Sequence, residues 1–465
     1  MSRPAPKSFH VKSFGCQMNA YDGTRMAELL EAQGMQAADS AEQAELIVLN
    51  TCHIREKAAE KVYSDIGRII KRSRGKQQPM IAVAGCVAQA EGAEIPRRAP
   101  AVDIVVGPQA YHNLPQLVAD AAQGKRALDT DMPAASKFDA LPGRRRPGPS
   151  AFLTVQEVCD KFCTYCVVPY TRGAEISRPR GAIVDEAKAL VDAGAREITL
   201  LGQNVNAWSG EDERGRAQGL DGLIRELDAL PGLARIRYTT SHPNDMSDRL
   251  IAAHGDVAKL MPFLHLPVQA GSDRILKAMN RSHDVASYLK LIERVRAVRP
   301  DIAISGDFIV GFPGETEADF AATLDIVGAV NHALAFSFKY SPRPGTPAAT
   351  MADQVDAEVM DERLQRLQAL LNEQQHGFNL ATVGKRCEVL IERDGKRPGQ
   401  RIGKSPWLQS VIVEDGPAIG ELMTVDIVAA GPNSMTGLVV TSPTLMAPAP
   451  STTPRSSAIS SINGG

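Results

Sequence analysis

Residues 152–166 read FLTVQEVCDKFCTYC, an apolar run that leads directly into three closely spaced cysteines. The run predicts a β-strand over 152–158 and places Cys159, Cys163 and Cys166 on the loop that follows it. Three thiolates on one short loop can bind three irons of a four-iron, four-sulfur cluster and leave the fourth iron open. Zinc is the competing metal, but structural zinc needs four ligands in paired spacing and no fourth Cys or His lies nearby in the sequence.

Downstream of this loop, apolar runs alternate with helical patterns such as 184–193 and 288–298. A helix over 361–375, rich in Leu, Gln and Arg, follows the last of these units. The pattern predicts an α/β fold, a partial (β/α)6 barrel whose site lies at the C-terminal ends of its strands. Its strands are predicted over 152–158, 197–201, 236–240, 263–268, 302–310 and 335–340.

Upstream of the loop, short apolar strands alternate with helical patterns and predict a parallel α/β sheet domain. The predicted strands are 9–14, 46–49, 81–84 and 103–106. The first three lead into Cys16, Cys52 and Cys86, respectively. Because parallel strands end on the same edge of a sheet, these distant thiols can converge in space.

After the barrel, short β-type runs punctuated by Gly and Pro predict a small β-barrel, with strands over 387–391, 408–413, 422–429 and 438–441. The predicted domains are 8–128, 151–376 and 378–441, with a Pro- and Gly-rich linker over 129–150 and a disordered tail over 442–465. Cys387 starts a strand away from the other cysteines and is predicted to pack as a small hydrophobe.

The composition excludes several classes of protein. The 465 residues include 52 basic and 54 acidic side chains, so the net charge of −2 excludes a uniformly basic nucleic-acid binder. No apolar run approaches the ~18 residues that span a bilayer, and we expect a cytoplasmic protein without a membrane partner. A local basic patch in the small β-barrel fits phosphate contacts with folded RNA. Its residues are Arg393, Lys396, Arg397, Arg401 and Lys404.

The cysteine loop, with Tyr165 before its last cysteine, resembles the signature of the radical S-adenosylmethionine (SAM) enzymes. That resemblance implies that SAM binds the open iron and is cleaved to a 5′-deoxyadenosyl radical. With Cys16, Cys52 and Cys86 upstream and a small barrel downstream, the whole chain is similar to the methylthiotransferases. In that family the upstream cysteines hold a second four-iron, four-sulfur cluster, and the C-terminal barrel is an RNA-binding TRAM domain.

Local strings select one branch of this family: residues 50–68 (NTCHIREKAAEKVYSDIGR), 167–179 (VVPYTRGAEISRP), 200–208 (LLGQNVNAW) and 339–350 (KYSPRPGTPAAT). They resemble the tRNA enzymes that convert N6-isopentenyladenosine beside the anticodon to its 2-methylthio form. The alternatives are the same chemistry on threonylcarbamoyl-adenosine tRNA or on a ribosomal protein, and a non-catalytic iron-sulfur sensor that binds RNA. The expected partners are this tRNA and an electron donor such as a flavodoxin or ferredoxin, and the expected state is a monomer.

The resemblance leaves no catalytic role for a side-chain acid or base, because the clusters and SAM carry the chemistry. Glu175 and Arg178 are candidates for the amino and carboxylate groups of SAM. Gln203 and Asn204 end a predicted strand, where they can reach ribose hydroxyls. Two further candidates for the cofactor site are Tyr165 and Asp307. The isolated His242, His265 and His283 are not assigned as metal ligands.

Overall fold

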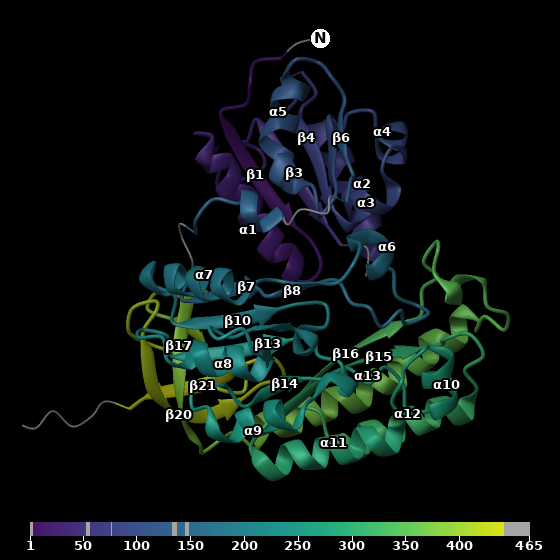
Figure 1. Cartoon of the computed structure of the whole chain (residues 1–465), viewed down its shortest axis with the longest axis vertical. Helices are drawn as coiled ribbons and strands as arrows, with labels where there is room; N and C mark the ends of the chain where they lie inside the picture. Colours follow the sequence, from purple (N-terminus) through teal and green to yellow (C-terminus); the bar gives the residue numbers. More distant parts are fainter. Residues whose placement is uncertain (1–2, 53–55, 76, 133–136, 145–147, 441–465) are drawn as a thin grey trace, which may run out of the picture.

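The computed structural model describes residues 3–52, 56–75, 77–132, 137–144 and 148–440. An N-terminal α/β domain stands on a central barrel domain, and a C-terminal β-barrel packs against the side and base of the central domain (Figure 1). The predicted tail over 442–465 lies outside the described residues. Within the described ranges, no helix combines the length and the apolar character needed to cross a bilayer.

The N-terminal domain is built on a six-stranded parallel sheet in the order β2-β1-β3-β4-β5-β6. Helices cover both faces, which explains why every residue of β3 and β4 is buried. The strands are β1 (Ser8–Ser13), β2 (Gln36–Ala37), β3 (Leu46–Thr51), β4 (Met80–Gly85), β5 (Ile104–Val106) and β6 (Ala127–Asp129). The helices are α1 (Gln17–Ala32), α2 (Glu56–Arg72), α3 (Cys86–Glu91), α4 (Glu94–Arg98), η1 (Tyr111–Asn113), α5 (Leu114–Ala122) and η2 (Lys137–Ala140).

Four strands of this sheet were predicted, and the two edge strands were missed. β2 consists of two exposed residues, and β6 has only three residues, of which Ala127 alone is buried, so neither forms an apolar run that a sequence pattern can detect. β1, β3 and β4 are neighbours in the sheet, and each is followed by a cysteine. The predicted parallel arrangement is therefore confirmed, and it brings the three strand ends to one edge.

The central domain is an open barrel of six parallel strands in two sheets, β13-β10-β7 and β14-β15-β16. A bridge between Ile236 and Leu260 connects the two sheets. The strands are β7 (Ser150–Thr154), β10 (Glu197–Leu201), β13 (Arg235–Thr239), β14 (Phe263–His265), β15 (Ala303–Val310) and β16 (Leu334–Lys339). The main helices are α6 (Val168–Arg172), α7 (Arg180–Asp192), α8 (Leu220–Asp228), α9 (Asp248–Asp256), α10 (Asp273–Ala278), α11 (Val285–Val298), α12 (Glu317–Val330) and α13 (Ala357–Leu380). The short elements are η3 (Val205–Ala207), β11 (Ser209–Glu211), β12 (Ala217–Gly219), η4 (Pro243–Asp245) and η5 (Pro347–Thr350).

The predicted partial barrel is confirmed, but its first strand is shorter than the expected 152–158. β7 ends at Thr154, and Gln156–Glu157 (β8) turns away to pair antiparallel with Ile176–Ser177 (β9). The core lies between the strands and the outer helices, where Leu200 and Ile236 are fully buried. Capping boxes at Asp284 and Thr316 satisfy the first backbone amides of α11 and α12 and so fix where these helices begin.

The C-terminal domain is a closed barrel in the strand order β17-β18-β19-β21-β20. Its strands are β17 (Arg386–Asp394), β18 (Arg401–Lys404), β19 (Ser410–Val413), β20 (Leu422–Ala430) and β21 (Met435–Val439). The predicted barrel is confirmed, but β18 was missed because RIGK has a basic residue at each end and reads as a charged loop. A Cβ at Gly403 would lie 2.3 Å from the carbonyl oxygen of Leu390, so this close approach of β17 and β18 requires glycine. Cys387 is buried in the apolar core of the barrel, as predicted.

Two buried arginines of β13 hold the C-terminal barrel against the central one. Arg235 donates to the carbonyl oxygens of Lys404 and Glu388, both at 2.8 Å. Arg237 donates to the carbonyl oxygen of Ser405 at 2.9 Å and to that of Pro406 at 2.8 Å. Glu197 accepts from Nε of Arg237 at 2.9 Å and balances its charge.

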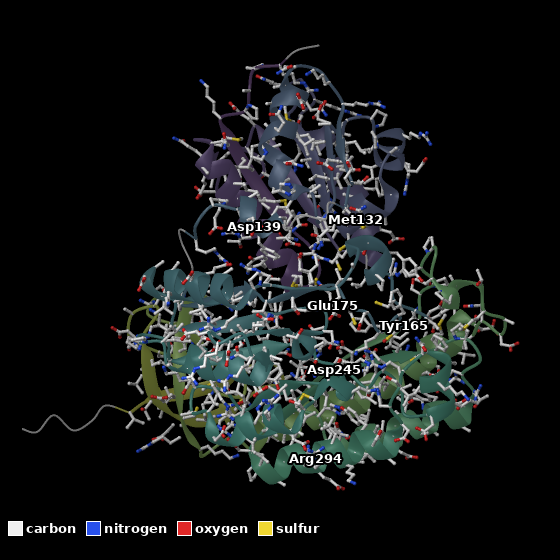
Figure 2. All side chains as sticks on the ribbon, in the orientation of Figure 1. Met132, Asp139, Tyr165, Glu175, Asp245 and Arg294 are labelled. Atoms are coloured by element: carbon white, nitrogen blue, oxygen red, sulfur yellow. The ribbon has the colours of Figure 1, made fainter. Side chains whose placement is uncertain are left out.

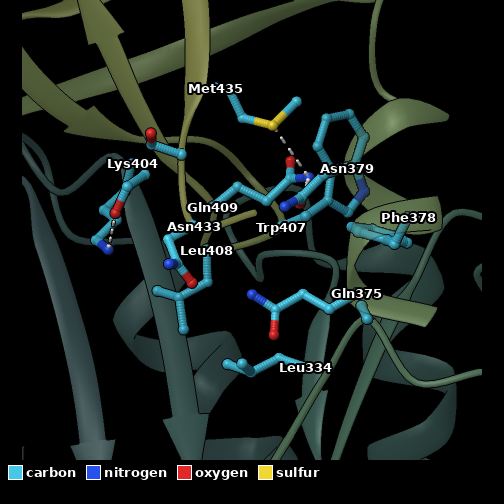
Figure 3. Close-up of a pocket in the computed structure, with 13 residues that line it drawn as sticks. Leu334, Gln375, Phe378, Asn379, Lys404, Trp407, Leu408, Gln409, Asn433 and Met435 are labelled. Atoms are coloured by element: carbon cyan, nitrogen blue, oxygen red, sulfur yellow. Dashed lines mark hydrogen bonds between the residues drawn. The ribbon is translucent and has the colours of Figure 1, made fainter. Parts of the chain in front are cut away.

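A cavity of about 190 Å³ lies along the same seam, beside Trp407 and Gln409 (Figure 3). It includes Leu334, the first residue of β16, and is therefore at the end of the barrel opposite to the C-terminal strand ends. Because the cysteine loops follow the C-terminal strand ends, this cavity belongs to the domain seam and not to the candidate site.

We predict that Arg237→Ala destabilises the junction with the C-terminal barrel by about 3–5 kcal/mol, because it strips a close partner from the buried Glu197 carboxylate. Urea unfolding followed by tryptophan fluorescence and by protease release of the C-terminal barrel measures the effect. Arg225→Ala is the matched control, since Arg225 pairs with Asp256 on the surface at 3.0 Å. Its cost should stay below about 1 kcal/mol. Equal effects of the two changes would contradict the assignment.

Candidate metal centre

The loop with Cys159, Cys163 and Cys166 lies between β8 and α6, at the C-terminal side of the central barrel. Nη1 of Arg281 lies 3.7 Å from Sγ of Cys163 and donates to it. The amide of Thr164 donates to the carbonyl oxygen of Met279 at 3.0 Å, which ties the loop to the end of α10. The loop is therefore fixed by residues more than a hundred positions away in the chain.

Burial dominates the acid-base behaviour of two of these thiols. It raises the pKa of Cys159 to about 11 and that of Cys166 to about 12, and neighbouring Cys163 adds to both shifts. Metal ligation requires the thiolate form, so a bound cation must supply the charge that makes deprotonation favourable. Burial raises the pKa of Tyr165 well above its usual value, and the neighbouring Cys163 adds to this shift.

The residue before the first cysteine is strained. Val158 has a φ of 69°, which a β-branched residue rarely adopts. The side-chain oxygen of Gln203 accepts from the amide of Val158, and the side-chain amide of Gln156 donates to its carbonyl oxygen. Gln156 Oε1 in turn accepts from the amides of Gln203 at 3.0 Å and Asn204 at 3.1 Å. These two glutamines hold the strained conformation in which the cysteine loop begins.

Glu175, predicted to contact SAM, lies beside the loop. Its carboxylate accepts from the amide of Asp160 at 3.2 Å, and the ligand atoms of Cys159, Asp160 and Glu175 lie within 4.8 Å of one another. Burial raises the pKa of Glu175, and the charge of Asp160 adds to this shift. In Figure 2, Glu175 and Tyr165 lie in the band between the N-terminal domain and the body of the central barrel.

The other predicted cofactor residues have the following partners. Nδ2 of Asn204 donates to Oδ2 of Asp245 at 2.7 Å, at the end of β10. Asp307 on β15 lies 3.3 Å from Nε2 of His265. The guanidinium of Arg178 instead turns toward the domain junction, where it donates to the carbonyl oxygen of Thr154 and, at 2.8 Å, to Glu186. Arg178 is therefore engaged in a buried ion pair, whereas its expected contact with SAM stays a prediction.

The second set of cysteines gathers at the edge of the N-terminal sheet. Cys16 follows β1 and caps α1, Cys52 follows β3, and Cys86 begins α3 after β4. A hydrogen bond with Cys52 lowers the pKa of Cys16 to about 6, while burial opposes this shift and the charge of Arg172 supports it. A Cβ at Gly15 would lie 2.1 Å from Cβ of Cys52, and Gly15 has a φ of +105°, so glycine is needed here.

The helix that follows the central cysteine loop packs against the N-terminal domain beside Cys86. Arg172 ends α6, the helix that follows the central cysteine loop, and α6 packs on α3, which begins at Cys86. Burial raises the pKa of Cys86, and the nearby positive charge of Arg172 opposes this shift. The predicted convergence of the three upstream thiols at one sheet edge is consistent with these contacts.

Sequence patterns did not identify Arg172, Arg281 or Gln156 as part of the site. Arg172 stands in a string that was used only for the family resemblance, and Arg281 follows α10 with no motif around it. Their place in the site depends on tertiary contacts, which cannot be predicted from the spacing of residues along the chain. Three soft sulfur ligands in each of the two sets fit iron-sulfur clusters better than a zinc site with paired ligands.

Three family models match the chain. The uncharacterized protein family UPF0004 matches residues 8–107, the radical SAM superfamily residues 153–327, and the TRAM domain residues 380–440. Among solved structures, the radical SAM methyltransferase TsrM from Kitasatospora setae is similar with a TM-score of 0.55 and 15% identity, over 75% of this chain and 77% of that chain. This likeness supports the fold alone.

Curated relatives match nearly the whole chain. The tRNA-2-methylthio-N(6)-dimethylallyladenosine synthase of Sphingopyxis alaskensis is 72% identical over 94% of this chain and 98% of its own length. The protein of the same name from Novosphingobium aromaticivorans is 70% identical over 94% of this chain and 98% of its own length. That from Cereibacter sphaeroides is 60% identical over 93% of this chain and 98% of its own length. The chain therefore belongs to the radical SAM superfamily and, within it, to the family of tRNA-2-methylthio-N(6)-dimethylallyladenosine synthases.

Proposed function

We propose that this protein adds a methylthio group to C2 of N6-isopentenyladenosine beside the anticodon of tRNA. The observation that supports the proposal is the packing of α6, which follows the central cysteine triad, on α3, which begins at Cys86 of the N-terminal triad. The relatives that share 60–72% identity with this chain carry the name of this activity. A reaction that joins a hydrogen abstraction to a sulfur transfer needs both sites in one cavity.

When bound, the two four-iron, four-sulfur clusters and SAM supply the radical and sulfur chemistry that no side-chain acid or base can perform. Cys159, Cys163 and Cys166 hold one cluster and leave an iron open for SAM. Arg281 donates to Cys163 and keeps the loop against α10. The other cluster is held by the N-terminal triad, which consists of Cys16, Cys52 and Cys86.

Around the open iron, the residues of the central domain bind and orient SAM. Glu175 lies next to Cys159 and is the carboxylate in position for the amino group of SAM. Gln203 and Asn204 follow β10 and are the candidates for hydrogen bonds to the ribose of SAM, while the side-chain oxygen of Gln203 holds Val158. Tyr165 and Asp307 contribute to the same pocket from the loop and from β15, and Arg178 positions the adjoining backbone through Thr154.

The C-terminal barrel contacts the tRNA through its basic patch. Arg393 and Lys396 are exposed, at the end of β17 and just beyond it. Arg397 pairs with Glu414, and Arg401 pairs with Asp394, so acidic neighbours reduce the net charge of the patch more than the local sequence indicates. Lys404 donates to Ser410 at 2.9 Å and lines the seam cavity, so it belongs to the edge of the patch.

The proposal also includes an electron donor such as a flavodoxin or ferredoxin, a monomeric state and a cytoplasmic location. Phe162, between the first two cysteines of the central loop, is 58% exposed, which puts this part of the loop at the surface where a donor can approach.

We predict that the protein reconstituted without oxygen binds about eight irons, and that replacing either cysteine triad with alanine leaves about four. Iron and acid-labile sulfide analysis measures both. Cys387→Ala is the matched control, because Cys387 is buried in the C-terminal barrel core and its replacement should leave the iron content unchanged. About four irons in the unmodified protein, lost with only one triad, would contradict the two-cluster assignment.

We predict that the reconstituted protein converts N6-isopentenyladenosine in tRNA to its 2-methylthio form when SAM and a reductant are present. Mass spectrometry of digested nucleosides measures the product. The variant with Cys16, Cys52 and Cys86 changed to alanine should still cleave SAM but should form no product, because it lacks the sulfur-bearing site. Modification of threonylcarbamoyl-adenosine or of a ribosomal protein instead would contradict the substrate, and RNA binding without SAM cleavage would indicate a sensor.

We predict that Arg393→Gln combined with Lys396→Gln weakens tRNA binding. The plot of the logarithm of the association constant against the logarithm of the salt concentration should become less steep by about 1.5 to 2, because two phosphate contacts are lost. Filter binding at several salt concentrations measures the slope. Arg386→Gln is the control, since Arg386 pairs with Asp426 on another part of the barrel at 2.7 Å. A slope equal to that of the control variant would show that the patch does not contact RNA.

A further inference from the structure

Four charged side chains are buried together between the N-terminal and central domains. Asp22, Lys137, Glu157 and Arg172 are each 1–3% exposed. Arg172 donates to Asp22 at 2.9 Å and to Glu157 at 3.2 Å, and Lys137 donates to Glu157 at 2.7 Å. With two cations and two carboxylates, the cluster is neutral, so neither domain buries an uncompensated charge.

Arg172 has contacts that the carboxylates do not require. A guanidinium has five N–H donors in a planar fork. Glu157 accepts one hydrogen bond from Nη1 of Arg172 and Asp22 accepts one from Nη2, so the two carboxylates use only some of these donors. The helix that Arg172 ends packs on α3, which begins at Cys86, and the positive charge of Arg172 acts on the thiols of Cys86 and Cys16. The side chain therefore carries a buried positive charge directly to the thiols of the N-terminal triad.

The backbone position of Arg172 matters as much as its charge. It is the last residue of α6, a five-residue helix that follows the central cysteine loop, and its carbonyl oxygen accepts from Nε2 of Gln109 at 3.0 Å. Gln109 belongs to the N-terminal domain. Both the backbone and the side chain of Arg172 therefore hold it against the N-terminal domain.

We propose that Arg172 is a positioning residue for the auxiliary cluster: its guanidinium places a buried positive charge beside Cys86, offsets the negative charge of the cluster and holds it toward the SAM-binding loop. The inference rests on the proposed function only in assigning a cluster to the N-terminal cysteines. Hydrogen bonds to sulfur and nearby cations stabilise the reduced, more negative cluster. Removing the guanidinium should therefore shift the reduction potential of the auxiliary cluster to more negative values.

The test uses the full-length protein with Cys159, Cys163 and Cys166 changed to alanine, so that only the auxiliary cluster is observed. Arg172→Gln, Arg172→Lys and the double variant Asp22→Asn/Arg172→Gln are compared with this parent. The double variant removes one charge of each sign and keeps the junction neutral, which guards against a simple failure to fold. Potentiometric titration followed by electron paramagnetic resonance gives the potential and the spectrum, and iron analysis gives the occupancy.

We expect about four irons in the double variant, a more negative potential and a changed spectrum, with a smaller shift in Arg172→Lys, which keeps the charge. Arg144→Lys is the matched control, because Arg144 is buried at the same junction and pairs with Glu28 at 3.1 Å and Glu186 at 3.2 Å. Its potential should equal that of the parent.

An unchanged potential and spectrum in both Arg172→Gln and the double variant would overturn the proposal and leave Arg172 a structural ion-pair residue. Because no tRNA is present, this result is independent of the substrate. If the unmodified protein failed to modify tRNA while the potential shifted as expected, the proposed function would fail and the role of Arg172 would stand.

Discussion

The buried ion pairs of Arg172 with Asp22 and Glu157 are the interaction on which the arrangement of the two domains depends. They connect α1 of the N-terminal domain, β8 of the central domain and the helix that follows the central cysteine loop. Desolvated charges are stable only when their partners stay in place, so this cluster tolerates little relative movement of the domains. The junction is therefore a rigid support for the two sets of thiols and not a flexible hinge.

The backbone conformation next to the thiols also serves to hold them in fixed positions. Gly15 lets β1 pass close to Cys52, and the strained Val158 turns the chain out of β7 and β8 into the central cysteine loop. Gln156 and Gln203 stabilise that turn by hydrogen bonds to both sides of Val158. Strain of this kind is retained where surrounding contacts define one conformation, and here it sets the direction from which the first cysteine enters the site.

The sequence predicted the parts of the site that depend on spacing along the chain. Cys159, Cys163 and Cys166 share one loop, and the other three cysteines follow neighbouring parallel strands, so the grouping of each set could be predicted from loop spacing and strand order. Contacts that depend on side-chain reach could not be predicted. Gln203 was expected at a ribose, yet its oxygen binds the Val158 amide, because β10 and the cysteine loop approach closely only after folding.

The same distinction explains the errors in the fold. β18 was missed because Arg401 and Lys404 mask a strand that owes its place to pairing with β17 and β19 on both sides. Glu414 lies on the chain beyond β19 and reaches Arg397 only when the barrel closes, so the basic patch looked more positive in the sequence than it is in the structure.

The central claim is that the two cysteine triads hold clusters that share one cavity across the domain boundary. Electron paramagnetic resonance of the fully reduced two-cluster protein tests it most directly, because neighbouring paramagnetic clusters broaden and split one another's signals. Two clusters in one cavity should give a spectrum with such interaction, which disappears when either triad is replaced by alanine. A two-cluster spectrum equal to the sum of the two single-cluster spectra would contradict it.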